Sequence, residues 1–344
     1  MKIIKSKIII KNISINKFSK IIDAVSRLEK TKFKFLIVVD KNNFFLGVLN
    51  DGDIRRGLLS GYTIEDKIKK IFNKNPVYLK KMIDESGIEK LIIKKDVNFI
   101  PIIKNKQVER VFVGNNDDHA KIKNKLVIMA GGKGTRLGKF TKKIPKPMLK
   151  IKGRPIMDHL IENSKKQGVF DFIISVNYLG SVISNYFKNG KSRNINIKYI
   201  KEKLPLGTAG SLYFLKNEKN DLLVTNADLI TNVDFSDLLK FHKDHKSDFT
   251  VVIKKINWSF PYGAIKYKNF KLIELNEKPM YKSEVIAGVY ALNPRVLKEI
   301  KKPSFLNITD LINKLISLKK NVHVYPIYEE WTDIGSYNDY LKMK

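Results

Sequence analysis

A glycine-rich loop is the first segment whose residue types could do chemistry. It follows the apolar run Leu126-Val-Ile-Met-Ala130 and reads Gly131-Gly-Lys-Gly-Thr-Arg-Leu-Gly138. Glycines after a parallel strand let backbone N–H groups approach a phosphate closely, and an arginine adds a fixed pair of donors. Further on, Lys146 stands between two prolines, which restrict the backbone around it. The segment predicts a cradle for a triphosphate, with Arg136 as a donor and the ammonium of Lys146 held in a set direction.

Two better-known phosphate-binding loops are excluded by spacing. A Walker loop needs Gly-Lys followed directly by Ser or Thr, whereas Lys133 is followed by Gly134. The dinucleotide fingerprint G-x-G-x-x-G needs a glycine at position 137, which is a leucine. Taken by itself, the loop could also be a turn with a purely structural role.

A second chemical group lies at the end of another apolar run. Leu222-Leu-Val-Thr225 leads into Asn226-Ala-Asp228. A carboxylate at the exit of a parallel strand lies in the crevice where open α/β sheets bind ligands. Because the chain has no cysteine, any metal ion must be held by oxygen or histidine ligands.

The string A-G-G-x-G-T-R-L, followed by P-K-P-M, resembles the sugar-phosphate nucleotidyltransferases, and the resemblance runs from Leu126 to the carboxyl terminus. It implies an enzyme that uses Mg²⁺ to join a nucleoside monophosphate to a sugar 1-phosphate and releases pyrophosphate. It also implies an α/β fold, with a mixed, mostly parallel, Rossmann-like sheet between helices over residues 125–344.

The resemblance assigns roles to individual residues. It makes Arg136, Lys146, Asp228 and Asp333 catalytic, with the two aspartates as magnesium ligands; Asp333 lies in Glu330-Trp-Thr-Asp-Ile-Gly335. The nucleotide contacts are Ala130, Gly131, Gly132, Gly134, Thr135 and, in Glu202-Lys-Leu-Pro-Leu-Gly-Thr-Ala-Gly210, Gly207. The sugar-phosphate contacts are Gly263, Glu277 and Lys278. An ordinary turn at Gly207 and a helix-capping role for Asp333 are the alternatives.

These assignments suggest an in-line reaction. An oxygen of the sugar 1-phosphate attacks the α-phosphorus of the nucleotide, and pyrophosphate leaves. That oxygen is already ionised, so we expect no general base, and positioning and charge neutralisation dominate. Arg136 would neutralise the pyrophosphate and Lys146 the α-phosphate, while Lys278 would align the nucleophile.

The first 120 residues contain an internal repeat. Phe35–Leu49 matches Phe99–Val113 without a gap at an offset of 64 residues, and each copy reads as strand, turn and strand after a helical pattern. Two such units resemble a tandem pair of CBS domains, a module that binds adenine nucleotides or mediates dimerisation. In that pattern Asn50 and Asp53 occupy the positions that hold ribose and phosphate, but the usual hydroxyl is missing. A packing or dimerisation module that binds no nucleotide is therefore left open.

Composition limits the partners. The net charge is +32, but only 8 of the 66 basic residues are arginine and the lysines are scattered, which favours a general compositional bias over nucleic-acid binding. The amino terminus and the rest of the chain lack an apolar run long enough for a signal peptide or a membrane span. We expect a cytoplasmic enzyme that binds neither nucleic acid nor membranes, and a homodimer, if one forms, held chiefly by the first half.

The CBS-like pair ahead of the transferase resembles the arrangement in glucosamine-1-phosphate guanylyltransferases of the route to legionaminic acid, a bacterial cell-surface glycan component. It therefore favours GTP and glucosamine 1-phosphate or a related hexose 1-phosphate. Uridylyl, thymidylyl and cytidylyl transfer stay open. So does a protein of the same fold that senses nucleotide sugars without turnover.

Overall fold

The computed structural model describes residues 2–31, 33–95, 97–114 and 121–343. It divides into two compact units, Met1–Asp118 and His119–Lys344. Each unit has its own hydrophobic clusters. No helix among the described residues is long and apolar enough to cross a bilayer.

The amino-terminal unit is built of short strands and helices around two three-stranded sheets, with strand orders β2-β3-β4 and β1-β6-β5. Its elements are β1 (Lys2–Ile4), α1 (Lys7–Asn12), β2 (Ser14–Asn16), α2 (Ile21–Thr31), β3 (Phe35–Val39), β4 (Phe45–Asn50), α3 (Asp51–Leu59), the 3₁₀ turn η1 (Ile68–Lys70), α4 (Glu85–Lys95), β5 (Phe99–Lys104) and β6 (Gln107–Val113). Helix α2 buries Ile21, Ala24, Val25 and Leu28, which is the spacing of one helical face.

The predicted internal repeat is confirmed by the strand pairing. Ile15 pairs in parallel with Val38. The equivalent residues 64 positions further on, Leu79 and Ile102, also form a parallel pair. The hairpins β3–β4 and β5–β6 also shift register at equivalent points, after Val38 and after Ile102. The equivalent rings of Phe35 and Phe99 stack on each other, with centroids 3.6 Å apart. The two copies therefore meet through matching residues.

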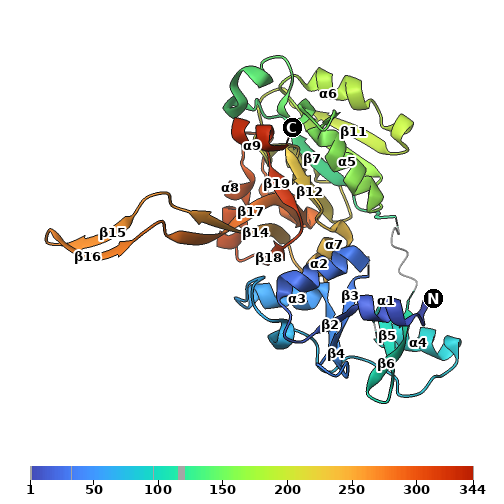
Figure 1. The fold of residues 1–344 in the computed structure, drawn as a ribbon. Helices are drawn as coiled ribbons and strands as arrows, with labels where there is room; N and C mark the ends of the chain where they lie inside the picture. The colour runs from blue at the N-terminus through green and yellow to red at the C-terminus, as the bar shows by residue number, and fades with distance from the viewer. Residues whose placement is uncertain (1, 32, 96, 115–120, 344) are drawn as a thin grey trace. The chain divides into compact units, whose positions relative to one another are not determined.

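The second unit contains a seven-stranded sheet among its described residues, with strand order β11-β10-β7-β12-β17-β14-β18 (Figure 1). Four neighbouring pairs are parallel, and the pairs of β17 with β12 and with β14 are antiparallel. This confirms the expected α/β fold with a mixed, mostly parallel sheet.

The strands of this unit are β7 (Leu126–Ala130), β8 (Lys150–Ile151), β9 (Arg154–Pro155), β10 (Asp171–Val176), β11 (Asn196–Lys201), β12 (Leu222–Asn226), β13 (Leu229–Thr231), β14 (Phe249–Ser259), β15 (Ala264–Lys268), β16 (Lys271–Asn276), β17 (Met280–Leu292), β18 (Val322–Ile327) and β19 (Trp331–Asp333). The helices are α5 (Ile156–Lys166), α6 (Gly180–Phe187), α7 (Phe235–Asp244), α8 (Ile308–Ser317) and α9 (Tyr337–Met343), with 3₁₀ turns η2 (Thr135–Thr141), η3 (Lys146–Met148), η4 (Lys191–Arg193), η5 (Gly210–Leu215) and η6 (Pro294–Glu299).

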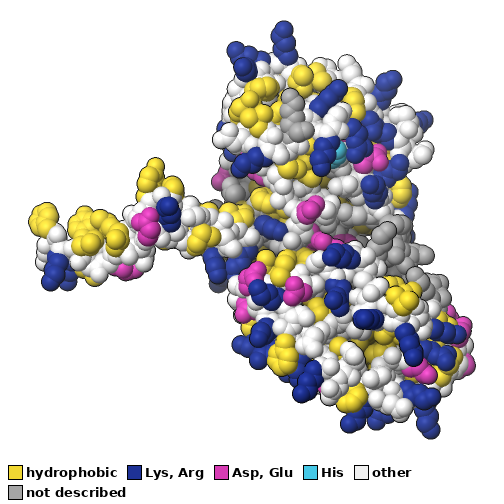
Figure 2. Space-filling model, viewed as in Figure 1, with side chains coloured by type: hydrophobic (Ala, Val, Ile, Leu, Met, Phe, Trp, Pro, Cys, Tyr) yellow, Lys and Arg dark blue, Asp and Glu magenta, His cyan; other side chains and the backbone are white. Residues whose placement is uncertain are grey.

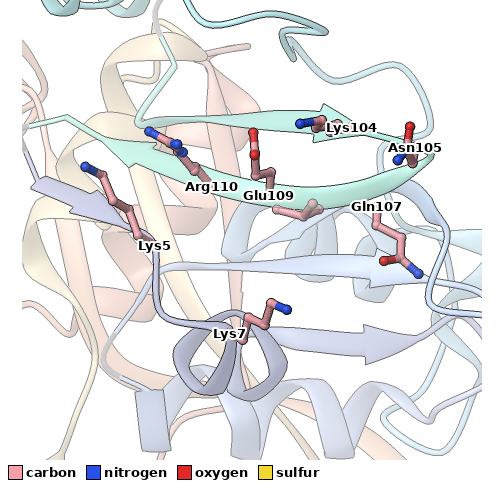
Figure 3. Close-up of a pocket in the computed structure, with 8 residues that line it drawn as sticks. Lys5, Lys7, Lys104, Asn105, Gln107, Glu109 and Arg110 are labelled. Atoms are coloured by element: carbon pink, nitrogen blue, oxygen red, sulfur yellow. The ribbon is translucent and has the colours of Figure 1, made fainter.

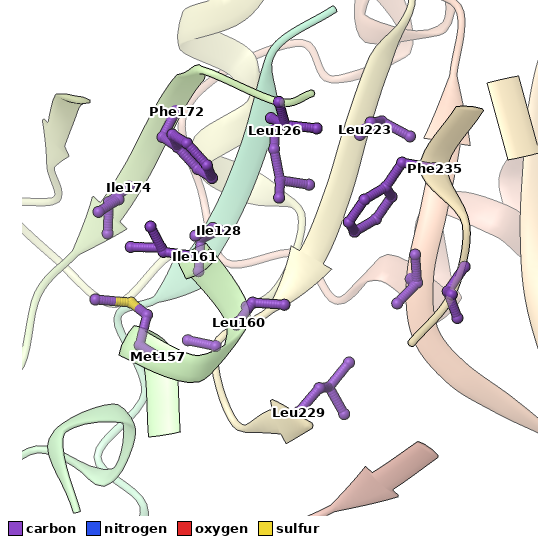
Figure 4. Close-up of a cluster of buried hydrophobic side chains, with 14 of the residues drawn as sticks. Leu126, Ile128, Met157, Leu160, Ile161, Phe172, Ile174, Leu223, Leu229 and Phe235 are labelled. Carbon is purple, nitrogen blue, oxygen red and sulfur yellow. The ribbon is translucent and has the colours of Figure 1, made fainter. Parts of the chain in front are cut away.

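Strand β7 is apolar throughout because both of its faces are covered. Leu126 and Ile128 pack in one cluster with residues of α5, α6 and α7, as Figure 4 shows for α5. Val127 and Met129 pack in a second cluster with residues of η5, η6 and α8. Successive side chains of a strand point to opposite faces, so this alternation makes a sheet between two helical layers. The layers fix β7, and with it the loop that follows.

The stretch from Asn115 to Lys125 is polar, charged and non-periodic, which predicts a linker, but this prediction needs a correction at its end. Residues 115–120 lie outside the described part of the chain. Ile122 is buried and forms a parallel bridge with Val169, and the Lys125 ammonium pairs with Glu218 at 2.6 Å. Residues 121–125 therefore already belong to the second unit. The buried side chain of Ile122 is enough to anchor this charged stretch there.

Candidate nucleotide and metal site

The glycine-rich loop begins where β7 ends and is held closely against Lys146. Gly134 has a left-handed backbone, with φ at 63°, and a side-chain carbon there would lie 2.9 Å from Cβ of Lys146. The hydroxyl of Thr141 donates to the carbonyl of Gly134 at 3.0 Å and closes the turn. Sequence alone placed both cations near a phosphate; the structure adds that the loop and the Pro-Lys-Pro segment pack directly together.

Gly134→Ala is expected to damage the loop more than a general glycine substitution would. Alanine at position 134 meets both the left-handed backbone and Lys146, so we expect a loss of about 2–3 kcal/mol in the free energy of unfolding, with reduced turnover. Gly153→Ala is the matched control, because Gly153 also has a positive φ, of 81°, with no atom within 4 Å of the added carbon. It should cost about 1 kcal/mol. Equal losses in the free energy of unfolding for the two variants, measured in urea, would contradict the close packing of Gly134 on Lys146.

Asp228 lies beside the loop because its strand is the neighbour of β7. Strand β12 runs parallel to β7, with Asn226 opposite Met129, so both chains leave the sheet at the same edge. The N–H of Ala227 donates to the carbonyl of Met129 at 3.2 Å. The nearly buried ammonium of Lys146 forms an ion pair with the carboxylate of Asp228. The loop, Lys146 and Asp228 therefore form one cluster.

Asp333 joins Asp228 through a small separate sheet. Strands β13 and β19 pair antiparallel, with Leu229 opposite Asp333. The N–H of Ile334 donates to the carbonyl of Asp228 at 3.2 Å. Two aspartates 105 residues apart in the chain are thus adjacent in the fold. Arg136 also lies close to Asp333, because a side-chain carbon at Gly335 would lie 3.5 Å from Oδ2 of Asp333 and 3.7 Å from Nη1 of Arg136. The structure therefore brings together the four residues predicted to be catalytic.

The electrostatics of the cluster centre on Asp333. Burial raises the pKa of its carboxyl above the ordinary value, and the nearby carboxylate of Asp228 raises it further, while Lys146 and Arg136 lower it. The Oδ1 atom of Asp333 is buried without a hydrogen-bond partner. A buried carboxylate oxygen with no donor is costly, and such groups often mark a functional site.

Asp333→Asn is expected to raise the Tm of the protein in EDTA at neutral pH, because it removes a buried charge close to Asp228. The raised pKa means that the folded chain holds a proton on Asp333 more tightly than the unfolded chain does. The buried charge therefore lowers the free energy of unfolding in full above the pKa of the folded state. This loss disappears below the ordinary aspartate pKa of 3.8. The gain in Tm should shrink as the pH approaches about 4. Asp244→Asn, at an exposed position, should change the Tm little. A fall in the Tm of Asp333→Asn, or a change no larger than that of Asp244→Asn, would contradict this interpretation.

The residues present fit a divalent cation. The described residues contain no cluster of three or more histidine, aspartate or glutamate side chains that could hold a metal. However, Mg²⁺ is usually held by one or two carboxylates together with water and substrate phosphates. The unpartnered Oδ1 of Asp333, next to the carboxylate of Asp228, is the kind of oxygen donor that such an ion requires.

The turn at Gly207 is built by a close backbone approach. Gly207 has φ at 70°, and a side-chain carbon there would lie 2.5 Å from the carbonyl oxygen of Leu306. The N–H of Ala209 donates to the same carbonyl at 2.9 Å. Glycine is therefore required here by packing, whatever the turn binds. The 3₁₀ turn η5 follows it.

Glu202 is a residue whose role at the site the sequence did not indicate. Its carboxylate accepts from the hydroxyl of Ser175 at 2.7 Å and from the N–H of Leu206 at 3.0 Å. A side-chain carbon at Gly131 would lie 3.0 Å from one of its oxygens. Glu202 therefore ties the Gly207 turn to β10 and to the first glycine of the loop. The only sequence signal was its position at the head of the segment that contains Gly207.

The residues predicted to contact the sugar phosphate lie apart from this cluster. Gly263, Glu277 and Lys278 are exposed, at the base of the hairpin β15–β16, which projects away from β7, β12 and β19 (Figure 1). A side-chain carbon at Gly263 would lie 3.2 Å from the carboxylate of Glu277, so these two residues are neighbours. The structure does not bring the three to the aspartates.

In the amino-terminal unit, Asn50 and Asp53 are neighbours that use their side chains to cap α3. The side chain of Asn50 accepts from the N–H of Asp53 at 2.8 Å, and Asp53 accepts from the N–H of Asn50 at 2.9 Å. This reciprocal pair is a capping box, a sufficient structural reason for both residues. A pocket of about 360 Å³ lies elsewhere in the unit (Figure 3). It is lined by Lys5, Lys7, Lys104, Asn105, Gln107, Val108, Glu109 and Arg110.

The fold and the cluster define a class of protein. A sheet between two helical layers presents a glycine-rich loop, two cations and two carboxylates at one edge, which is how α/β proteins bind nucleotide phosphates. Residues 125–344 match the family model described as Nucleotidyl transferase, and the chain belongs to that family.

Known proteins resemble this part of the chain. The mannose-1-phosphate guanylyltransferase catalytic subunit beta of Dictyostelium discoideum is 33% identical over 225 residues, which are 63% of this chain and 62% of that protein. The mannose-1-phosphate guanyltransferase of Schizosaccharomyces pombe is 34% identical over 227 residues, with the same coverage. The chain thus spans about 62% of the length of these relatives. The crystal structure of HddC from Yersinia pseudotuberculosis has a TM-score of 0.52 and 25% identity, covering 64% of this chain and 97% of that one.

Proposed function

We propose that the chain transfers GMP from GTP to a hexose 1-phosphate, forming a GDP-sugar and releasing pyrophosphate. The observation that carries the proposal is the cluster of Arg136, Lys146, Asp228 and Asp333 beside the glycine-rich loop. Family membership supports the reaction type, and relatives whose names are guanylyltransferases support guanine as the base.

The residues of the cluster act on charge rather than on protons. An oxygen of the sugar 1-phosphate attacks the α-phosphorus, and the bond to the pyrophosphate oxygen breaks. Arg136 neutralises charge on the departing pyrophosphate with its planar pair of donors. Lys146 lies against the loop, where its ammonium balances the α-phosphate and holds Asp228 in place. The loop glycines, with Ala130 and Thr135, leave backbone N–H groups for the phosphates.

Asp228 and Asp333 would hold the Mg²⁺, which supplies charge stabilisation of phosphate oxygens when bound. Without an ion, burial and then repulsion from the carboxylate of Asp228 raise the pKa of Asp333. The same pair would repel the substrate phosphates, so the residues themselves make activity depend on a cation.

The sugar is less well defined than the base. The names of the relatives favour mannose 1-phosphate, whereas the arrangement with a CBS-like pair favours glucosamine 1-phosphate and the legionaminic acid route. Release of pyrophosphate should be followed with GTP, UTP, dTTP, CTP and ATP against both sugar phosphates in Mg²⁺. We expect GTP with a hexose 1-phosphate to react fastest. Absence of pyrophosphate release with every pair would show that the proposal is wrong. A preference for a pyrimidine nucleotide would exclude guanine as the base.

The amino-terminal unit is proposed to be a tandem CBS pair with a regulatory or packing role. The matched pairings of the two copies and the stack of Phe35 on Phe99 support it. Because Asn50 and Asp53 are engaged in the helix cap, a packing role without nucleotide is the simpler version. Titration of the full chain with AMP and ATP by calorimetry, in the absence of GTP, tests this. Binding abolished by Asp53→Asn would favour the regulatory version.

A further inference from the structure

The composition of the glycine-rich loop favours opening of the loop when no phosphate is bound. We define the loop as residues 131–142. It contains four glycines, which give its backbone many accessible conformations. It also contains four cations, Lys133, Arg136, Lys139 and Lys142, and no acidic residue, so its charges repel one another. The chain as a whole carries a net charge of +32, and Figure 2 shows lysine and arginine side chains over much of the visible surface. Such a loop needs bonds to the rest of the fold to be closed before a triphosphate arrives.

Apolar contacts hold the side chains of the loop. Leu137 is buried in a cluster with Ile156 and Ile334. The ring of Phe140 stacks on that of Tyr337, with centroids 5.0 Å apart. Apolar contacts are not directional, so they do not fix the orientation of the peptide groups at the end of the loop. Hydrogen bonds are needed for that.

Tyr178 supplies hydrogen bonds at both ends of the loop. Its hydroxyl lies 3.1 Å from the carbonyl oxygen of Thr141 and 3.1 Å from that of Lys142, and it donates to both by sharing its one proton. The N–H of Tyr178 also donates to the carbonyl of Gly131 at 3.5 Å, a long and therefore weak bond. A single residue outside the loop thus contacts its first and its last residue.

The effect of this hydroxyl reaches the phosphate-binding part of the loop through Thr141. The side chain of Thr141 is buried, and its hydroxyl lies 3.0 Å from the carbonyl of Gly134 and 3.2 Å from that of Gly138. The position of Thr141 therefore sets the turn at Gly134, which lies two residues before Arg136. Tyr178, Thr141 and Gly134 form a chain of hydrogen bonds that leads to the phosphate cradle.

Tyr178 is a firm anchor because it directly follows the end of β10. Val176, the last residue of β10, lies opposite Ala130 of β7. The side-chain amide of Asn177 donates to the carbonyl of Glu202 at 2.9 Å, and the N–H of Glu202 donates to the carbonyl of Val176 at 2.9 Å. The backbone on either side of β10 is thus fixed where the phenol of Tyr178 leaves it.

We propose that Tyr178 is a positioning residue for nucleotide binding, whose hydroxyl holds the loop closed before the triphosphate arrives. The inference rests on the proposed function for the identity of the nucleotide. A loop that is ordered in advance loses less conformational entropy on binding, so the hydroxyl strengthens the binding of GTP. It acts through a loop that holds the phosphates both before and during the reaction. Its loss should therefore raise the KM for GTP rather than lower kcat.

Tyr178→Phe tests the proposal, because it removes the hydroxyl and keeps the ring. In the full chain without nucleotide, we expect peptides from residues 131–142 to exchange their amide hydrogens about three- to tenfold faster, measured by mass spectrometry. The KM for GTP should rise by about the same factor. The KM for the hexose 1-phosphate and kcat should stay within about twofold of wild type. A general structural role would instead lower the Tm and weaken both substrates.

Tyr199→Phe is the matched control, because the phenol of Tyr199 also donates to a backbone carbonyl, that of Lys188, at 2.8 Å. This variant should leave the exchange of the loop and the KM for GTP unchanged. Unchanged loop exchange in Tyr178→Phe, equal effects of the two variants, or equal changes in the KM of both substrates would overturn the proposal. If the wild-type protein releases no pyrophosphate, the proposed function fails, but the exchange of the loop still decides whether Tyr178 holds it.

Thr141→Val tests the chain of hydrogen bonds, because valine keeps the shape of threonine and removes its hydroxyl. It should also speed the exchange of the loop. Combined with Tyr178→Phe, it should add little to the faster of the two single variants, because the two hydroxyls act in series on Gly134. Two independent effects that multiply in the double variant would contradict this route from Tyr178 to the phosphate cradle.

Discussion

Asp228→Asn is expected to lower kcat/KM for pyrophosphate release about 10³-fold, because it removes several kcal/mol of charge stabilisation at the phosphates. Asp228 has two partners at the site: its carboxylate pairs with Lys146, and its backbone carbonyl is bonded to Ile334 next to Asp333. The asparagine keeps the backbone bond and the side-chain shape. Only the charge and its ability to hold a cation are lost.

The substitution also leaves the nearly buried Lys146 without its ion pair, which should lower the Tm. The opposite shift expected for Asp333→Asn separates the two aspartates by a measurement that does not involve activity. Asp244→Asn, which makes the same chemical change at an exposed position, should keep wild-type activity and Tm. An Asp228→Asn enzyme within about threefold of wild type would remove this carboxylate from the mechanism.

Arg136→Ala is expected to lower kcat about 10²- to 10³-fold with a smaller effect on KM, as found when a preorganised charge-stabilising donor is removed. Arg136 is exposed at the loop, and its guanidinium lies near Asp333 and Gly335. Arg136→Lys should recover only part of the loss, because an ammonium keeps the charge but not the planar pair of donors.

Lys139→Ala is the matched control for Arg136, since it removes an exposed cation from the same 3₁₀ segment. If Lys139→Ala and Arg136→Ala reduced the rate equally, general positive charge around the loop would account for the effect. Arg136 would then have no specific role with the leaving pyrophosphate.

The sequence predicts the core of the fold because a strand covered by helices on both faces must be apolar throughout. Leu126–Ala130 is continuously apolar, since both faces of β7 are covered, and the glycines that follow mark where the strand gives way to a phosphate loop. The repeat was visible because equivalent strands need equivalent apolar residues, as Phe35 and Phe99 illustrate.

The convergence of Asp228 and Asp333 could not be read from spacing. It depends on the pairing of two three-residue strands, β13 and β19, that are distant in the chain and have no periodicity long enough to predict. Family resemblance alone suggested the pair. Glu202 was missed for a related reason: its partners, Ser175 and Leu206, come together only when β10 and the Gly207 turn are in place.

The hairpin β15–β16 illustrates a different limit. Ile265, Tyr267, Leu272 and Leu275 share one face because the register of the two strands shifts after Lys266, which their spacing in the sequence does not show. Likewise, Gly263 and Glu277 are identified by resemblance as sugar contacts, whereas their position depends on how this hairpin leaves the sheet.

Titration with Mn²⁺, observed by electron paramagnetic resonance, tests most directly whether Asp228 and Asp333 share one cation. The wild-type protein, Asp228→Asn, Asp333→Asn and the double variant should be compared without nucleotide. We expect each single substitution to weaken the same site by about 10- to 100-fold, and the double variant to lose little more, because both ligands serve one ion. Wild-type affinity in either single variant, or two independent losses that add in the double variant, would contradict the account.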